Sequence, residues 1–153
     1  MAIQNRRLPI ALTLTLAALL GMGSGTAQAD SVVGVWWSTV TRVDCNTGAE
    51  QGSFTGMQVY HLGGTLTDTN GTNPASRGPG MGTWQRVGHE VQTKFRFMLF
   101  NAGVFAGTAV VTRVITLAPG GDSATGAGRA EVYAPNGALV GGSCTRDVST
   151  RAN

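Results

Sequence analysis

Few residues in this chain have the chemistry to move a proton. The candidates are His61, Glu131 and Arg129. Arg129 and Glu131 alternate onto one face of a predicted strand, where they could orient or polarise a substrate, and His61 lies at a strand end. A salt-bridged surface pair explains Arg129 and Glu131 at least equally well. If the protein is an enzyme, these three residues are the expected catalytic set.

The sequence lacks the motifs of common enzyme classes. It contains no Gly-x-Ser-x-Gly, no His-Glu-x-x-His and no phosphate-cradling glycine loop. Cys45 and Cys144 have no histidine close in sequence and form a poor metal site. These observations favour a role other than catalysis, and we expect neither a metal nor a cofactor.

The first 29 residues have the form of a secretory signal peptide. Arg6 and Arg7 precede an apolar run from Ile10 to Leu20, and Ala27 and Ala29 occupy the two positions that a signal peptidase reads. We therefore predict cleavage after Ala29, a periplasmic or secreted product, and one domain formed by residues 30–153.

The charge of the chain argues against nucleic acid as a partner. The formal net charge is +3, but Arg6 and Arg7 contribute two of these charges and leave with the signal peptide. The remaining basic residues are spread along the chain without clustering. No later apolar run is long enough to span a membrane, so we expect no membrane span after signal removal.

Strands and turns are predicted throughout the mature chain. The odd-numbered residues from Val91 to Leu99 form one mainly apolar face, and Gln92, Lys94 and Arg96 lie on the other, as in a strand with one buried side. Glycine-rich and proline-rich segments separate the predicted strands. There are eight: Val33–Asp44, Ser53–Leu62, Thr65–Thr69, Gly82–Val87, Val91–Phe100, Val104–Leu117, Ala124–Tyr133 and Ala138–Val148.

Eight short antiparallel strands can form a sandwich or an up-and-down barrel. In an exported protein, Cys45 and Cys144 are expected to form a structural disulfide, with a reactive thiol as the alternative. Cys45 ends the first strand and Cys144 lies in the last, so this bond would fasten the seam of a closed barrel. The cysteines therefore favour an all-β, eight-stranded antiparallel barrel, although a sandwich could also bring them together.

Gly34-Val35-Trp36 in the first strand, together with Arg146 near the end of the last, resembles the structural signature of the calycins, the lipocalin and avidin-like barrels. The resemblance implies that Gly34 and Trp36 belong to the closed base of the barrel. It also implies that Trp36 packs against Arg146 in a cation–π contact.

The barrel interior could be filled by side chains or could hold one small ligand. In the seventh strand, the even-numbered residues from Ala124 to Val132 are small, whereas Arg129, Glu131 and Tyr133 lie on the other face. The small face could leave space for a ligand or let the strand bend. The candidate cavity walls are Trp37, Met57, Tyr60, Trp84, Phe95, Phe97 and Phe105, all of which could instead be ordinary core.

Three functions follow from these predictions. The first is an exported barrel that binds a small, largely apolar molecule in its interior. The second is a cofactor-free isomerase or cyclase that uses His61 or Glu131. The third is an inhibitor or interaction protein that acts through a rim loop, such as Asn70 to Gly80, and has a filled barrel.

Overall fold

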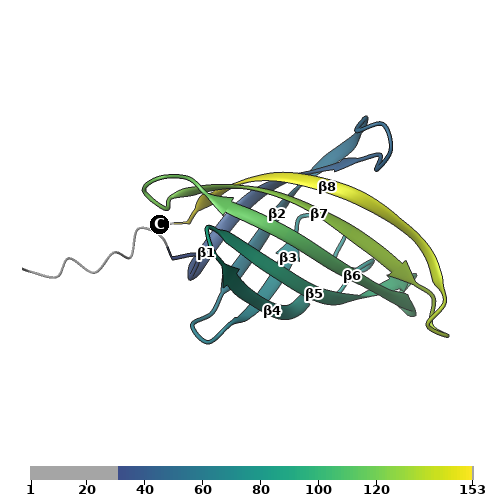
Figure 1. Ribbon diagram of the computed structural model, residues 1–153. Helices are drawn as coiled ribbons and strands as arrows, with labels where there is room; N and C mark the ends of the chain where they lie inside the picture. The colour runs from purple at the N-terminus through teal and green to yellow at the C-terminus, as the bar shows by residue number, and fades with distance from the viewer. Residues whose placement is uncertain (1–30, 153) are drawn as a thin grey trace, which may run out of the picture.

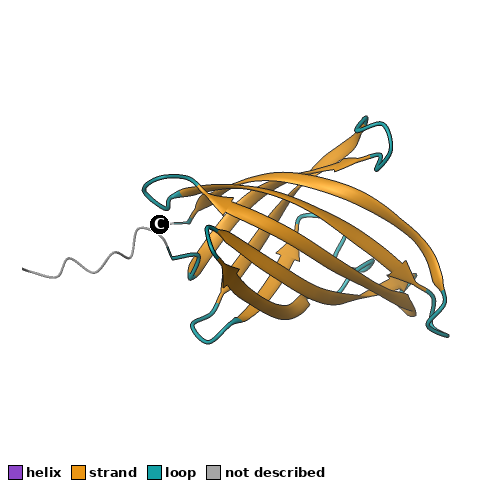
Figure 2. Cartoon of the chain, viewed as in Figure 1, coloured by secondary structure: helices purple, strands orange, loops and turns teal. Residues whose placement is uncertain are grey.

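The computed structural model describes residues 31–152, and the regular elements within that range are eight β-strands. The strands are β1 (Gly34–Val43), β2 (Glu50–Tyr60), β3 (Thr65–Asn70), β4 (Gly80–Val87), β5 (Glu90–Asn101), β6 (Val104–Leu117), β7 (Ser123–Tyr133) and β8 (Leu139–Arg151). Each pairs antiparallel with the next, and β8 closes on β1 (Figure 1, Figure 2). The predicted all-β fold and eight-stranded barrel are confirmed. The predicted signal peptide, residues 1–29, lies outside the described residues.

Two strands extend three residues beyond a predicted end. β2 begins at Glu50 rather than Ser53, and β8 ends at Arg151 rather than Val148. Both pair with β1, in which Val43 lies opposite Glu50 and Trp36 lies opposite Arg151. Pairing along the full length of β1 satisfies backbone groups that a shorter strand would leave open.

The alternation of buried and exposed residues places the faces of each strand. In β5, Val91, Thr93 and Phe95 are buried and Lys94 and Arg96 are exposed, as the sequence predicts. In β7 the small, even-numbered face points inward, because Ala124 belongs to the buried core and Gly126 faces Asp147 inside the barrel. This settles an orientation that the sequence leaves open.

One end of the barrel is closed by apolar packing around Trp36. Trp36 is only 2% exposed, and its indole Nε1 donates a hydrogen bond to Val32 O at 2.7 Å. The cluster around it includes Tyr60, Leu66 and Ile115. Burial in this cluster raises the pKa of Tyr60 to about 12. Both ends of the described chain lie at this closed end, opposite the β1–β2 and β7–β8 turns (Figure 1).

The arginine that packs on Trp36 is Arg151, not the predicted Arg146. The guanidinium carbon of Arg151 lies 4.5 Å from the Trp36 ring centroid, and its nitrogens donate to Val33 O at 2.7 Å and Ser31 O at 2.6 Å. Arg146 is even-numbered in β8 and points outward, where it pairs with Glu50. The prediction fails because β8 continues three residues beyond Val148 and brings Arg151 to the closed end.

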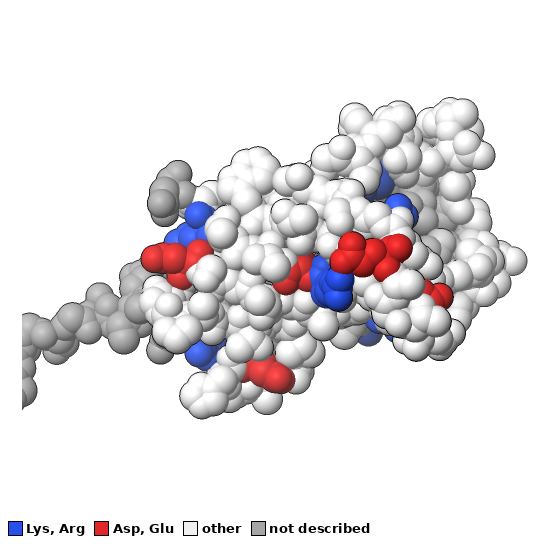
Figure 3. Space-filling view, turned by 90° about the horizontal axis from the view of Figure 1, so that it is seen from above, with Lys and Arg blue, Asp and Glu red and all other residues white. Residues whose placement is uncertain are grey.

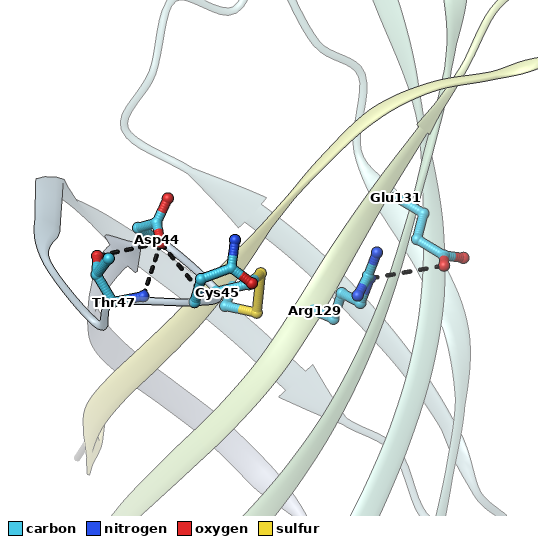
Figure 4. Close-up of a disulfide and its surroundings, with 7 residues drawn as sticks. Asp44, Cys45, Thr47, Arg129 and Glu131 are labelled. Atoms are coloured by element: carbon cyan, nitrogen blue, oxygen red, sulfur yellow. Dashed lines mark hydrogen bonds and ion pairs between the residues drawn. A yellow bond between two sulfur atoms is a disulfide. The ribbon is translucent and has the colours of Figure 1, made fainter.

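The disulfide joins Cys45, in the turn just after β1, to Cys144 of β8 and fastens the barrel seam, as predicted (Figure 4). The Cα atoms of Cys45 and Cys144 lie 5.1 Å apart. The turn after β1 is held by Asp44, whose carboxylate accepts hydrogen bonds from the backbone N–H groups of Thr47 at 2.8 Å and Asn46 at 2.9 Å. These hydrogen bonds lower the pKa of Asp44, and the turn therefore prefers the ionised carboxylate.

The outer surface carries sparse charges of both signs. On the face drawn in Figure 3, acidic and basic side chains lie beside one another between wide uncharged areas. This face has no continuous basic patch of the kind that binds nucleic acid. No helix long and apolar enough to cross a membrane occurs between residues 31 and 152.

Candidate ligand-binding cavity

A cavity of about 630 Å³ occupies the half of the barrel opposite Trp36. Its wall is formed by the ends of β1, β3, β5 and β7 and the beginnings of β2, β6 and β8, and includes part of the segment 71–79. The apolar part of the lining includes Val40, Phe54, Phe95, Phe97, Leu99 and Val111. The volume falls in the range of small-molecule sites in proteins.

The small residues of β7 have two different effects inside the barrel. Ala130 lines the cavity directly and leaves space there. Gly126 and Gly128 instead make room for charged side chains of neighbouring strands. A Cβ at position 126 would lie 2.6 Å from Asp147 Oδ1, and one at position 128 would overlap with Arg113 Cγ. Gly126 and Gly128 therefore make room for a buried ion pair. This role differs from the two predicted for the small face, which were space for a ligand and a bend in the strand.

A chain of hydrogen bonds crosses the interior between the cavity and the closed end. We call it the polar belt, and its members are Arg113, Asp147, Ser149, Ser38, Gln58, Asp68 and Arg77. On one side, Arg113 Nη2 donates to Asp147 Oδ2 at 2.5 Å, and Ser149 Oγ lies 3.1 Å from the same oxygen. The side chains of Arg113 and Asp147 are 5% and 0% exposed, so this ion pair is shielded from water.

The other side of the polar belt reaches the opposite wall. Ser38 Oγ lies 2.7 Å from Ser149 Oγ and donates to Gln58 Oε1 at 2.7 Å. Gln58 Nε2 then donates to Asp68 Oδ2 at 2.8 Å. The second buried ion pair completes the chain, with Arg77 Nη2 donating to Asp68 Oδ1 at 2.6 Å. Two arginines and two aspartates balance in charge, so the polar belt as a whole is neutral.

Arg77 reaches the interior from the segment 71–79 between β3 and β4. Its guanidinium carbon lies 3.8 Å from the Phe97 ring centroid, and its backbone forms a bridge with Leu99 of β5. Two further backbone hydrogen bonds join the segment to β5, from Gly78 N to Met98 O and from Phe100 N to Ser76 O. The segment is therefore fixed to the barrel wall near the cavity.

Of the seven residues predicted for the cavity wall, the structure brings two to it, Phe95 and Phe97. Tyr60 is buried in the closed-end core, and Trp84 packs against that core, edge-on to Tyr60 with ring centroids 6.3 Å apart. The other three are not among the lining residues. Trp37 and Met57 are partners across β1 and β2 on the outer face, and Phe105 is 45% exposed in the β5–β6 hairpin.

None of the three predicted catalytic residues lies in the cavity. Arg129 and Glu131 project from the outer face of β7 as a pair, with Nε and Oε1 3.7 Å apart (Figure 4). Tyr133 OH donates to Glu131 at 2.9 Å, which raises the pKa of Tyr133. His61 is exposed beyond the end of β2, where its Nε2 lies 3.1 Å from Thr67 Oγ1. Arg129 and Glu131 therefore form the surface ion pair that was the alternative to a catalytic role.

Sequence reasoning missed the polar belt, although the sequence holds a signal for it. Arg113 lies between Val111 and Ile115 on the buried, odd-numbered face of β6, and Asp68 shares the face of Leu66 in β3. A charged residue in phase with apolar neighbours on a strand points inward and needs a partner. Matching arginines with aspartates in such positions would have suggested buried ion pairs.

Comparisons with known proteins add little to this description. No family model and no curated protein matches the chain. The chain is similar to a solved structure, Rv2717c from M. tuberculosis, with 13% sequence identity and a TM-score of 0.42. The similarity covers 79% of this chain and 92% of that chain.

Proposed function

We propose that this protein is an exported barrel that binds one small, largely apolar molecule in its interior. The cavity of about 630 Å³ carries the proposal, because apolar atoms form most of its surface, polar side chains lie among them, and those at its inner end are fixed in the polar belt. The polar belt and the fixed segment 71–79 hold this lining in place, so a ligand would meet a largely pre-formed site.

Two further features support export and a calycin-like barrel. The disulfide between Cys45 and Cys144 suits an oxidising compartment, and the first 29 residues have the pattern of a signal peptide. Trp36 under Arg151 is similar to the closed base of calycins, with the arginine supplied by a later residue than Arg146.

The alternatives have less support. The enzyme hypothesis placed His61 or Glu131 in an apolar cavity, and both lie outside the cavity lining. The inhibitor hypothesis required a filled barrel and a protruding rim loop. The cavity and the attachment of Arg77 to Asp68 and Phe97 argue against it.

Binding of Nile red, a neutral apolar dye, tests the proposal. We expect one dye per barrel, with a blue-shifted and enhanced emission. Ala130→Trp places a large side chain in the cavity and should abolish binding. The control is Ala127→Trp, on the exposed outer face of the same strand, which should bind dye as the wild type does. Equal binding by the two variants would place the dye outside the barrel and defeat the proposal. Native mass spectrometry of the exported protein would show whether a small molecule is retained on purification.

A further inference from the structure

The two hairpins at the open end of the barrel present an uncharged, apolar surface. Residues 97–112, in the β5–β6 hairpin, and residues 132–145, in the β7–β8 hairpin, contain no Asp, Glu, Lys, Arg or His. Five large apolar side chains of these segments are between 45% and 70% exposed. We call them the apolar rim, and its members are Met98, Val104, Phe105, Leu139 and Val140.

The apolar rim extends across four neighbouring strands. Met98 of β5 pairs with Thr108 of β6. Thr108 pairs with Tyr133 of β7, which pairs with Leu139 of β8. Side chains of paired residues lie side by side on one face of a sheet. The exposed apolar residues of the two hairpins therefore belong to one surface, at the end of the barrel away from the ends of the described chain (Figure 1).

The cavity lies directly behind this surface. Phe105 of the apolar rim packs edge-on against Phe100, with ring centroids 6.4 Å apart. Phe100 in turn lines the cavity. A surface that binds the apolar rim would therefore lie next to the cavity.

The closed end of the barrel is less suited to an apolar contact. Two large apolar side chains are exposed at strand ends there, Leu62 after β2 and Val87 at the end of β4. Each follows a basic residue in the chain, His61 before Leu62 and Arg86 before Val87. Single exposed apolar residues are normal on a protein surface, whereas a group of them indicates an interaction site.

The unpaired charges near the apolar rim are mainly positive. Lys94 and Arg96 are exposed on the outer face of β5, and Arg42 is an exposed residue of the cavity lining. Among residues 31–152, no carboxylate lies within ion-pair distance of these three cations. Of the carboxylates that the structure describes on the outside of this end, two belong to ion pairs and the third is Asp44, in the β1–β2 turn. The excess of positive charge suits an anionic surface.

A lipid bilayer fits these observations better than a protein partner. The rim residues lie on hairpin ends, which form a projecting edge (Figure 1). Such an edge can enter the boundary between head groups and acyl chains, whereas a protein partner would need a matching groove. The cations behind the edge would then face anionic head groups.

We infer that the apolar rim docks on the surface of a bilayer that contains anionic lipids. In this position the cavity opens beside a phase that takes up apolar molecules, so the bilayer can supply or receive the ligand. This use of the surface rests on the proposed function. The contact itself requires no ligand and can be measured separately.

Co-sedimentation of the exported protein with lipid vesicles tests the inference. We expect it to bind phosphatidylcholine vesicles that contain phosphatidylglycerol. Vesicles of phosphatidylcholine alone should bind about fivefold more weakly, because cations near an anionic surface strengthen binding. High salt should reduce this difference.

A pair of double variants locates the contact. Val104→Asp with Leu139→Asp places two charges at strand ends in the apolar rim, and should weaken vesicle binding about tenfold or more. The control, Leu62→Asp with Val87→Asp, makes the same change in net charge at the closed end and should bind as the wild type does. Neither Val104 nor Leu139 lines the cavity, so the rim variant should still bind Nile red.

Three results overturn the inference. The first is a wild type that does not bind the anionic vesicles or does not prefer them, which requires no variant to fold. The second is equal binding by the rim variant and its control. The third is a wild-type dimer in analytical ultracentrifugation that the rim variant dissociates, because a second copy would then cover the apolar rim. Vesicle binding without Nile red binding in the wild type would instead defeat the proposed function and support the docking surface.

Discussion

The two ends of the barrel are built from the same strands but packed in different ways. At the closed end, Trp36, Tyr60, Leu66 and Ile115 fill the interior, and the second cavity there measures only about 10 Å³. At the open end, a cavity of about 630 Å³ remains between walls that combine apolar and polar side chains. A space of about 10 Å³ is barely enough for one water molecule.

The polar belt forms the boundary between the two ends, and its position explains the difference. Buried arginine and aspartate side chains need partners, and those partners hold the strand walls at fixed separations. Gln58 of the belt lines both cavities and Arg113 lines the larger one, so the belt separates the two ends over part of the interior, whereas Phe95 and Val111 of the cavity lining belong to the same apolar cluster as Trp36. A neutral, hydrogen-bonded layer can thus keep one half of a small barrel open while the other half is filled.

The largest effect is expected from removing the disulfide, which fastens the seam beside the open end. Cys45→Ser with Cys144→Ser should lower the free energy of unfolding by up to about 4.7 kcal/mol, because the two residues are separated by 99 positions and the bond restrains a long loop of the unfolded chain. Urea unfolding measures the change. Hydrogen exchange should show lost protection near Val43 before Trp36. Equal loss at both positions would contradict a closed end that is stable independently of the seam.

Breaking the polar belt should have the next largest effect. Arg113→Met leaves Asp147 buried without its cation and should cost about 3–4 kcal/mol in urea unfolding. The double variant Arg113→Met with Asp147→Leu removes both charges and should recover most of the stability, because a well-packed apolar pair often replaces a buried ion pair at little cost. If the double variant is as unstable as the single one, the belt stabilises the barrel through more than charge pairing.

Arg151 at the closed end and Arg146 on the outer face are two arginines of β8 that can be compared directly. Arg151→Met removes a cation–π contact and hydrogen bonds to the backbone at Ser31, Val33 and Gly121, and should cost about 1.5–3 kcal/mol. Arg146→Met removes one exposed ion pair, with Glu50, and should cost less than about 1 kcal/mol. Thermal unfolding ranks the two, and the reverse order would restore Arg146 as the residue that closes the barrel.

The contrast between Arg146 and Arg151 also shows where sequence reasoning stops. Alternation and turn residues are local, so they predict eight strands and, with Cys45 and Cys144, the closed barrel. The last residues of β8 are paired because β1 and β7 lie on either side of them, which is a property of the whole fold. Because β8 ends at Arg151 rather than at Val148, Arg151 and not Arg146 reaches Trp36.

The same reasoning explains the outcome for the cavity residues. A large apolar side chain indicates burial but neither the face nor the depth of the residue, so this criterion predicts Trp37 and Met57 in the cavity although they lie on the outer face. The alternation of inward and outward residues along each strand distinguishes them from Phe95 and Phe97, which line the cavity. The polar belt needs further information, because Asp147 and Arg113 meet across Gly128 only when β6, β7 and β8 are in their actual register.

The two tyrosines of the chain give the smallest and most local comparison of the ends. Tyr60 is buried and its pKa is raised from 10.0 to about 12, mainly by desolvation, whereas the pKa of Tyr133 is raised by its hydrogen bond to Glu131 on the outer surface. The folded state holds the Tyr60 proton more tightly than the unfolded state. Its contribution to stability is therefore complete below pH 10.0 and is lost as the pH rises toward about 12.

Alkaline titration of tyrosinate absorbance should therefore show an earlier step that Tyr133→Phe removes and a later step that Tyr60→Phe removes. In urea unfolding, Tyr60→Phe should lose the decline of stability above pH 10.0 that the wild type shows. Ionisation of both tyrosines in a single early step would mean that water reaches Tyr60. The filled interior beside Trp36 would then be as accessible as the cavity, and the distinction between the two ends of the barrel would not hold.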